Sequence, residues 1–197
     1  MITLAELKQY LKINDTTQDS FLQTCVDTAI NAVIQYCNRD FRLASYTQYF
    51  QGNGKNRLFL KNYPINSVSE IKKLDTTTYN YIDIITNAGD TIGNSTQLHG
   101  DGSLVLLKDY TFESGSEKVE NIKILYNGGY AAAPDDIKTV CKEIATEYYN
   151  NAPAGLGRLG KGSENIGGQS SKGSTYDPES VIKRHENVLN KYLNANI

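Results

Sequence analysis

Apolar and polar positions between Thr16 and Phe41 alternate with the period of an α-helix. The apolar side chains of this stretch recur about one helical turn apart, at Phe21, Leu22, Cys25, Val26, Ala29, Ile30, Val33, Ile34 and Cys37. This spacing predicts a long amphipathic helix. Thr16 precedes Asp19 in an arrangement that resembles a helix cap. The apolar stripe is broad, so we expect other elements to cover this helix on more than one side.

Three further segments carry helix signals. Thr3 and Glu6 form a capping box that begins a short helix, and the short connection should fold this helix back on the long one as a hairpin. Pro134, followed by two acidic residues, begins another helix, and Asp177-Pro178-Glu179 begins the last one. The apolar stripe after Pro134 should pack on the long helix. That pairing would bring the two ends of the chain together.

From about Leu43 the pattern changes to the alternation that is typical of β-strands. The candidate strands are 43–50, 57–60, 65–74, 79–85, 103–107 and 121–126. Gly52 and Gly54 mark a turn, which predicts that 43–50 and 57–60 pair as a hairpin. Short strands at this spacing indicate a small antiparallel sheet or a barrel-like unit.

These patterns together predict an α+β fold, in which a small antiparallel β-sheet or barrel-like unit is inserted into a helical bundle. We expect an N-terminal helical hairpin in 1–42, a β-rich insertion in 43–130 and C-terminal helices in 131–197. The first and last of these segments should pack as one helical unit. A loop rich in glycine and serine, 152–175, interrupts the C-terminal helices, and it has few apolar groups to offset its backbone entropy. Such a loop is usually functional or disordered.

The composition is that of a globular protein without a marked charge. The 197 residues are 39% hydrophobic and 21% charged, with a formal net charge of -2. This charge gives no general reason to expect affinity for nucleic acid or an anionic membrane. No apolar run approaches the roughly 18 residues of a membrane-spanning helix, and the N-terminus does not resemble a signal peptide. We therefore expect no membrane partner and assembly in a cytoplasm.

The chain has three cysteines and 14 tyrosines. Cys25 and Cys37 would lie roughly 18 Å apart on one helix, too far for a disulfide. Because Cys141 also lies on an apolar stripe, we expect three buried, reduced thiols and no metal site. Many tyrosines suit half-buried strands and subunit contacts, because one end of the ring is apolar and the other is wet.

The glycine-rich loop contains a formal nucleotide-binding fingerprint, Gly155-x-Gly157-x-x-Gly160. A genuine fingerprint follows a strand and begins a helix, whereas here a helix precedes it and more loop follows. A phosphate-binding P-loop would need Ser or Thr after Lys161, where Gly162 stands. The loop is therefore expected to be flexible or ordered by a partner, and no cofactor is predicted.

Candidate catalytic groups are few. His99 and His185 are the two histidines, and neither accompanies a serine or cysteine in a nucleophile context. The carboxylates of the β-rich segment, including Asp83 and Asp101, occupy turn-like positions and are expected to be solvated. A small hydrolase or carbohydrate-binding β module that uses Asp83, Asp101 and His99 is kept as a less favoured alternative. The favoured hypothesis is that the chain is not an enzyme.

The order of the elements and several local motifs resemble the head–tail connector, or adaptor and head-completion, family of tailed bacteriophages. The motifs are Leu4-x-x-Leu7-Lys8, Asp19-x-x-Leu22, Tyr36-x-x-Arg39-x-Phe41, Gly129-Tyr130 ahead of Pro134-Asp135, and Tyr176 ahead of Leu189-x-x-Tyr192. The resemblance covers nearly the whole chain. Two features depart from it: Asn150 and Asn151 stand where members commonly carry an arginine, and the β-rich segment is longer than in many members.

The resemblance implies a structural protein of the virion neck, assembled in the host bacterial cytoplasm. Its partners would be the portal protein, neighbouring copies of itself in a ring of commonly twelve subunits, and the next neck, stopper or tail protein. DNA would pass through the ring without sequence-specific binding. We expect the glycine-rich loop and the last helix to supply portal or subunit contacts, through Gly155, Leu156, Leu159, Ile166, Tyr176 and Tyr192. A second hypothesis is another phage morphogenesis protein, such as a tail-completion or capsid-associated factor.

Overall fold

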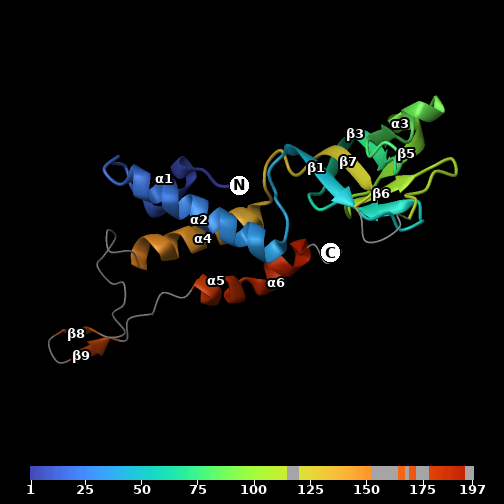
Figure 1. Ribbon diagram of the computed structural model, residues 1–197. Helices are drawn as coiled ribbons and strands as arrows, with labels where there is room; N and C mark the ends of the chain where they lie inside the picture. The colour runs from blue at the N-terminus through green and yellow to red at the C-terminus, as the bar shows by residue number, and fades with distance from the viewer. Residues whose placement is uncertain (115–119, 152–163, 167–168, 172–177, 194–197) are drawn as a thin grey trace. The chain divides into compact units, whose positions relative to one another are not determined.

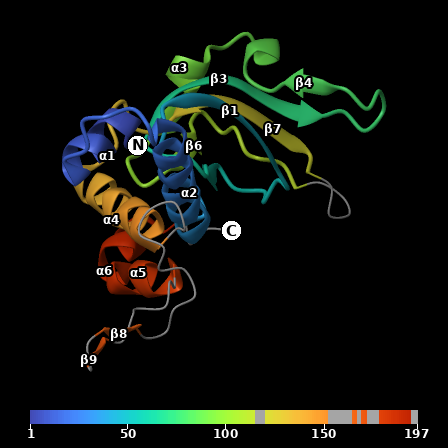
Figure 2. The same cartoon turned by 90° about the vertical axis from the view of Figure 1, so that its left-hand side faces the viewer.

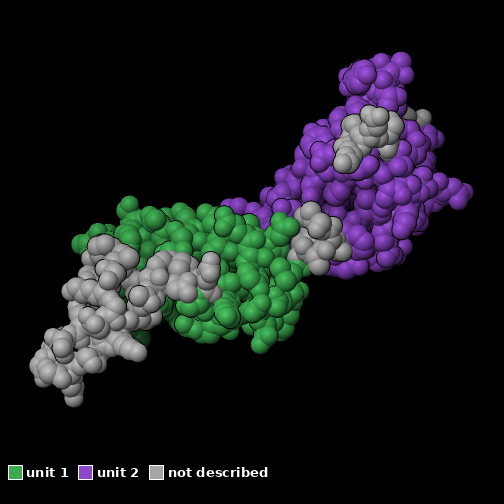
Figure 3. Space-filling model, turned by 60° about the horizontal axis from the view of Figure 1, so that its bottom comes forward, with its two compact units in different colours: residues 1–38, 133–194 green, residues 39–132, 195–197 purple. Residues whose placement is uncertain are grey.

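The computed structural model describes residues 1–114, 120–151, 164–166, 169–171 and 178–193. The chain divides into two compact units (Figure 3). Unit 1 combines Met1–Asn38 with Ala133–Asn194, and unit 2 is formed by Arg39–Ala132. The chain therefore leaves unit 1 after the second helix and returns to it before the helix that follows Pro134.

Unit 1 is helical. It contains α1 (Leu4–Leu11), α2 (Asp19–Cys37), α4 (Asp135–Asn151), α5 (Pro178–Arg184), α6 (Glu186–Leu189) and the 3₁₀ turn η2 (Asn190–Tyr192). The helices α2 and α4 pack along each other, α1 contacts both, and α5 and α6 lie against α4 (Figures 1 and 2). The apolar stripes of α2 and α4 supply most of the buried side chains of this unit, so the predicted pairing of the two stripes is present.

The ends of the first two helices are formed differently. Thr3 and Glu6 make the complete capping box at α1, as predicted. At α2 the N-cap is Gln18, whose side chain makes no capping hydrogen bond, so the predicted cap by Thr16 is wrong. The carboxylate of Asp19, at the positive end of the helix dipole, is instead paired with the amine of Lys8 from α1.

The C-terminal part of unit 1 departs from the prediction in two places. The last helix is broken at His185, which separates α5 from α6. Inside the loop that was expected to lack structure, β8 (Glu164–Ile166) and β9 (Gln169–Ser171) pair as a short antiparallel ladder. The residues around this ladder lie outside the described part of the chain.

Unit 2 contains two antiparallel sheets. The strand order of the first is β1 (Ala44–Phe50), β7 (Ile122–Gly128), β3 (Ile65–Leu74) and β4 (Tyr81–Asp83). The order of the second is β2 (Arg57–Phe59), β6 (Ser103–Leu106) and β5 (Thr96–Leu98). Two short helical turns, η1 (Thr86–Ala88) and α3 (Ile92–Ser95), connect β4 to β5. Helices and antiparallel sheets together confirm the predicted α+β class.

The predicted hairpin between 43–50 and 57–60 is wrong. β1 pairs with β7, where Tyr46 lies opposite Tyr126, and β2 pairs with β6 in the other sheet. The turn between β1 and β2 is held from outside: the Gly52 amide donates to the Asn121 side chain at 2.7 Å, and the Gly54 amide donates to the Phe112 carbonyl at 2.8 Å. These bonds fix the turn in a conformation that places β1 in one sheet and β2 in the other.

A single apolar core lies between the two sheets. Its buried members come from both, and they are Leu58, Leu60, Ile65, Ile71, Ile85, Leu104, Leu106, Phe112, Ile122, Ile124 and Tyr126. All four residues of β6 are buried, whereas every second residue of β7 is buried. The first pattern is typical of a strand that is covered on both faces, and the second of a strand with one face outward.

The predicted strand 79–85 is shorter in the structure, where β4 spans Tyr81–Asp83. Tyr79 lies outside the strand because its backbone is left-handed (φ 55°).

Candidate functional site

Most of the predicted interface residues lie outside the described part of the chain; this applies to Gly155, Leu156, Leu159 and Tyr176. Ile166 ends the strand β8, opposite Gln169. Tyr192 lies in η2, and its hydroxyl donates to both carboxylate oxygens of Asp136 at 2.9 and 3.0 Å. This contact ties the last described turn of unit 1 to the first turn of α4. Together these six residues stay a prediction.

The three side chains of the hydrolase alternative belong to turns. The Asp83 carboxylate accepts the backbone amides of Ile85 and Thr86, at 2.9 and 2.7 Å. The Asp101 carboxylate accepts the hydroxyl and the amide of Ser103, and these bonds lower the pKa of Asp101. The backbone amide of His99 donates to the Ser103 carbonyl at 3.0 Å. Each carboxylate thus stabilises its own loop, as is usual for Asp in turns.

The cysteines are buried in unit 1, as predicted, and all three are free. Burial raises the pKa of the Cys25 thiol to about 11 and that of the Cys141 thiol to about 12. Since the thiolate is the form that attacks or binds metal, these pKa values favour inert packing groups. Within the described residues, no three His, Cys, Asp or Glu side chains gather as a metal site. In the same part of the chain, no helix has the length and apolar character that crossing a membrane requires.

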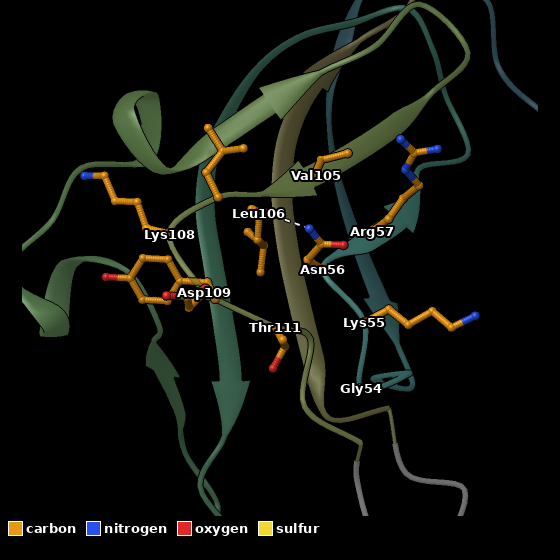
Figure 4. Close-up of a pocket in the computed structure, with 11 residues that line it drawn as sticks. Gly54, Lys55, Asn56, Arg57, Val105, Leu106, Lys108, Asp109 and Thr111 are labelled. Carbon is orange, nitrogen blue, oxygen red and sulfur yellow. Dashed lines mark hydrogen bonds between the residues drawn. The ribbon is translucent and has the colours of Figure 1, made fainter.

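A surface depression in unit 2 is lined by two arms of the chain (Figure 4). One arm is 54–57 and the other is 105–111. The arms are joined by backbone hydrogen bonds from the Leu106 amide to the Asn56 carbonyl at 2.7 Å and from the Phe112 amide to the Lys55 carbonyl at 2.8 Å. The Asn56 side chain also donates to the Leu106 carbonyl at 3.2 Å, which Figure 4 marks with a dashed line.

The rim of this depression carries three basic side chains, Lys55, Arg57 and Lys108, and one carboxylate, that of Asp109. Lys55 and Arg57 are exposed, and their side chains extend away from the sheet in Figure 4. Among the residues that the structure describes, neither forms an ion pair, whereas Lys108 on the other arm is bound to Asp90 at 2.7 Å. An amine and a guanidinium that form no ion pair can bind carboxylates or phosphates. The depression therefore fits a docking surface for anionic groups better than a catalytic cleft.

A second exposed feature of unit 2 is the turn between β3 and β4. The Asp75 carboxylate accepts the Thr77 amide at 3.0 Å and the Thr78 hydroxyl at 2.6 Å, and the Tyr79 amide donates to the Asp75 carbonyl at 2.8 Å. This ordered turn presents Tyr79 with 79% of its surface exposed. Exposed aromatic side chains on rigid supports are common anchors of protein interfaces.

The sequence reasoning missed both features. The depression has no signal in the sequence, because the 54–57 and 105–111 arms are about fifty positions apart and meet only through the pairing of β2 with β6. For Tyr79 the preceding Asp-Thr-Thr-Thr run was a turn signal that the strand assignment overrode.

Comparison with protein families gives a match over almost the full length: a model described as "Head completion protein" (HCP) covers residues 1–195. The chain belongs to the head completion protein family. The resemblance to head–tail connector and head-completion proteins is thereby confirmed. No curated protein matches this head completion protein.

Solved structures similar to this head completion protein come from gene transfer agent (GTA) particles. The neck of the native GTA particle, computed with C12 symmetry, matches with a TM-score of 0.57 and 13% identity, covering 98% of this chain and 89% of the other. The neck of the empty particle, computed with C6 symmetry, gives a TM-score of 0.56 at 13% identity, with 93% and 88% covered. The virion of the native particle gives the same values. At this identity the likeness shows that the fold is shared.

Proposed function

We propose that this head completion protein is a structural protein of the neck of a tailed phage or phage-like particle. In this proposal its copies form a ring that docks under the portal and extends the DNA channel towards the tail. The observation that carries the proposal is the family match over residues 1–195, which spans both units. The shared fold with neck components of GTA particles supports the same role.

The ring is supported by the symmetry of a similar neck. A similar neck was computed with C12 symmetry, which supports twelve copies for the proposed ring. A cyclic ring also requires two different patches on each subunit, because its contacts are head to tail.

We assign the surfaces as follows. The helices of unit 1 build the ring wall, and the loop and last helix contact the portal or the adjacent subunit through the six residues named above. Unit 2 faces outward or towards the next neck, stopper or tail protein. The net charge of -2 suits a wall along a DNA channel, because strong attraction of phosphates would retard the passage of DNA.

The test is reconstitution from purified components. The full-length protein is mixed with its portal protein and examined by negative-stain electron microscopy and mass photometry. A closed ring on the portal supports the proposal. Assembly with tail components alone would replace it with the second hypothesis, a tail-completion factor. In parallel, Leu156 and Leu159 are both replaced by serine. If each leucine buries about half of its side chain against the portal, portal binding should weaken at least tenfold.

A further inference from the structure

Arg39 is a buried cation surrounded by aromatic rings. Its side chain is fully buried. The guanidinium carbon lies 3.4 Å from the ring centroid of Tyr63, 4.8 Å from that of Phe41 and 5.7 Å from that of Tyr130. One terminal nitrogen, Nη2, donates to the Tyr63 carbonyl. Among the described residues, Nε and Nη1 have no hydrogen-bond acceptor.

Burying a charge in this way is unfavourable unless the surroundings compensate it. The faces of the three rings carry negative partial charge, so they compensate the guanidinium where acceptors are missing. A planar guanidinium can also stack face to face on a ring, which the tetrahedral ammonium of lysine cannot do. Arg39 is therefore suited to hold these rings together, and a residue that only filled space would be apolar.

The rings come from different parts of the chain. Phe41 lies in the segment by which the chain enters unit 2, and Tyr130 lies in the segment by which it leaves. The Tyr130 amide donates to the Phe41 carbonyl at 2.9 Å, and the two rings are stacked with centroids 6.3 Å apart. Arg42 and Tyr130 also form an isolated parallel bridge. Within unit 2, the entering and leaving segments thus lie side by side.

We propose that Arg39 is a positioning residue that clamps these two segments, so that the chain enters and leaves unit 2 at one fixed place. The proposal rests on the proposed ring, because identical subunits can close a ring only if each has the same geometry. Arg39 would then be required for assembly although it lies on no surface. This role also explains the Tyr36-x-x-Arg39-x-Phe41 motif, whose arginine and phenylalanine belong to the same cluster.

The decisive variant is Arg39→Met in the full-length chain. Methionine fills a similar volume without charge, and replacing a buried charge by an apolar side chain is often neutral or stabilising. A purely space-filling role predicts unchanged behaviour. The clamp predicts that the amide of Tyr130 exchanges hydrogen about tenfold faster or more, while the amides of Ile124 and Tyr126 in β7 keep their protection. Ring formation on the portal should fall in parallel.

Arg42→Met is the matched control, because the Arg42 side chain is 61% exposed and paired with Asp40 outside the cluster. It should leave the Tyr130 amide as protected as in the wild type. If Arg39→Met does not fold, Tyr130→Leu removes one ring and keeps the backbone amide, and the amide at position 130 is read in that variant instead. Wild-type protection at position 130 in the variant that folds would overturn the clamp. Failure of the wild type to form a ring would instead count against the proposed function, and amide exchange would still decide the role of Arg39.

Discussion

The amine of Lys8 lies 2.5 Å from the carboxylate of Asp19, so one ion pair joins α1 to the first residue of α2. The same amine donates to the Asp15 carbonyl at 2.6 Å, in the connection between the two helices. The side chains of Lys8 and Asp19 are only 16% and 34% exposed. Since α2 has no side-chain cap, this pair gives the first turn of α2 a polar contact with α1.

We predict that Lys8→Met lowers the free energy of unfolding by about 1 kcal/mol, because a partly shielded ion pair and a hydrogen bond are lost together. Urea denaturation measures the change. Lys183→Met is the control, since Lys183 is exposed and has no ion pair within the described residues, and it should change the free energy by less than about 0.5 kcal/mol. Equal effects of the two substitutions would contradict the assigned role of Lys8.

Tyr126 connects the two sides of the core of unit 2. Its hydroxyl donates to the Gln48 side chain at 2.5 Å and accepts the Asn62 amide at 3.1 Å, and burial raises the pKa of Tyr126 to about 12. Tyr126→Phe should cost about 1–2 kcal/mol of unfolding free energy, because a buried amide loses its acceptor. Tyr46→Phe is the matched control: the Tyr46 ring neighbours that of Tyr126, its hydroxyl donates to the Arg42 carbonyl at an exposed site, and the loss of this bond should cost about 0.5 kcal/mol. Chemical denaturation of both variants tests this order.

Gly129 lies where the chain leaves β7. Its backbone is left-handed (φ 94°), and a Cβ there would stand 2.2 Å from the Arg42 carbonyl oxygen. Gly129→Ala should therefore destabilise the protein by about 3 kcal/mol, through strain and displacement of the Arg42 backbone. Gly93→Ala, in the short helix α3, meets nothing within 4 Å and should be neutral or stabilising by up to about 1 kcal/mol. Thermal unfolding of both variants is the measurement, and similar melting temperatures would refute the strain argument.

The buried thiols predict a loss of stability in alkali. The folded pKa of Cys141 is about 12, against 9.0 for an unperturbed thiol, and that of Cys25 is about 11. Above pH 9.0 the unfolded chain therefore binds fewer protons than the folded one, so the unfolding free energy decreases as pH rises towards these folded values. The expected slope is about 1.4 kcal/mol per pH unit for each thiol.

This slope is reached only above pH 9.0, because below that pH the thiols of the unfolded chain stay largely protonated, so it is measured by urea denaturation between about pH 9.5 and about pH 10.5. Cys141→Ala should reduce it by about 1.4 kcal/mol per pH unit, because one of the buried thiols that titrate in the unfolded chain is removed. The slope is the test, since alanine also changes packing and thus the free energy at every pH. A variant with the slope of the wild type would show that Cys141 titrates normally in the folded protein.

The cationic depression predicts an electrostatic contact with the next neck component. In the double variant Lys55→Glu and Arg57→Glu, binding of that component should weaken at least about tenfold, while the ring on the portal still forms. A matched variant with the same change in net charge, Lys12→Glu and Lys183→Glu, lies in unit 1 and should bind normally. Surface plasmon resonance at two salt concentrations measures both, and equal loss in the two variants would indicate a general charge effect.

Elements that depend on neighbouring residues could be predicted from the sequence. The capping box at Thr3 and the strand β3 were predicted with the bounds that the structure has, because caps and alternation are local signals. The partner of β1 could not be predicted. The turn at Gly52 is able to close a hairpin, but its amide bonds Asn121, sixty-nine positions away, and β1 pairs with β7.

The candidate docking surface could not be predicted from the sequence, for the same reason. Lys55 and Arg57 look like ordinary surface residues until the pairing of β2 with β6 brings the 105–111 arm beside them. Tyr79 was assigned to a strand, and only its left-handed backbone takes it out of the sheet and exposes it. The Asp83 and Asp101 carboxylates behaved as the turn chemistry of their neighbours predicts.

The sequence alone determined the helices α1, α2 and α4, the α+β class and the family, because hydrophobic periods and motifs are properties of residues close together in the chain. Only the tertiary structure decided what surrounds Arg39. A guanidinium is expected in water, and it is buried here because rings from positions 41, 63 and 130 converge on it. Burial of a charge depends on the groups that compensate it, and those groups are brought together only by the pairing of distant strands.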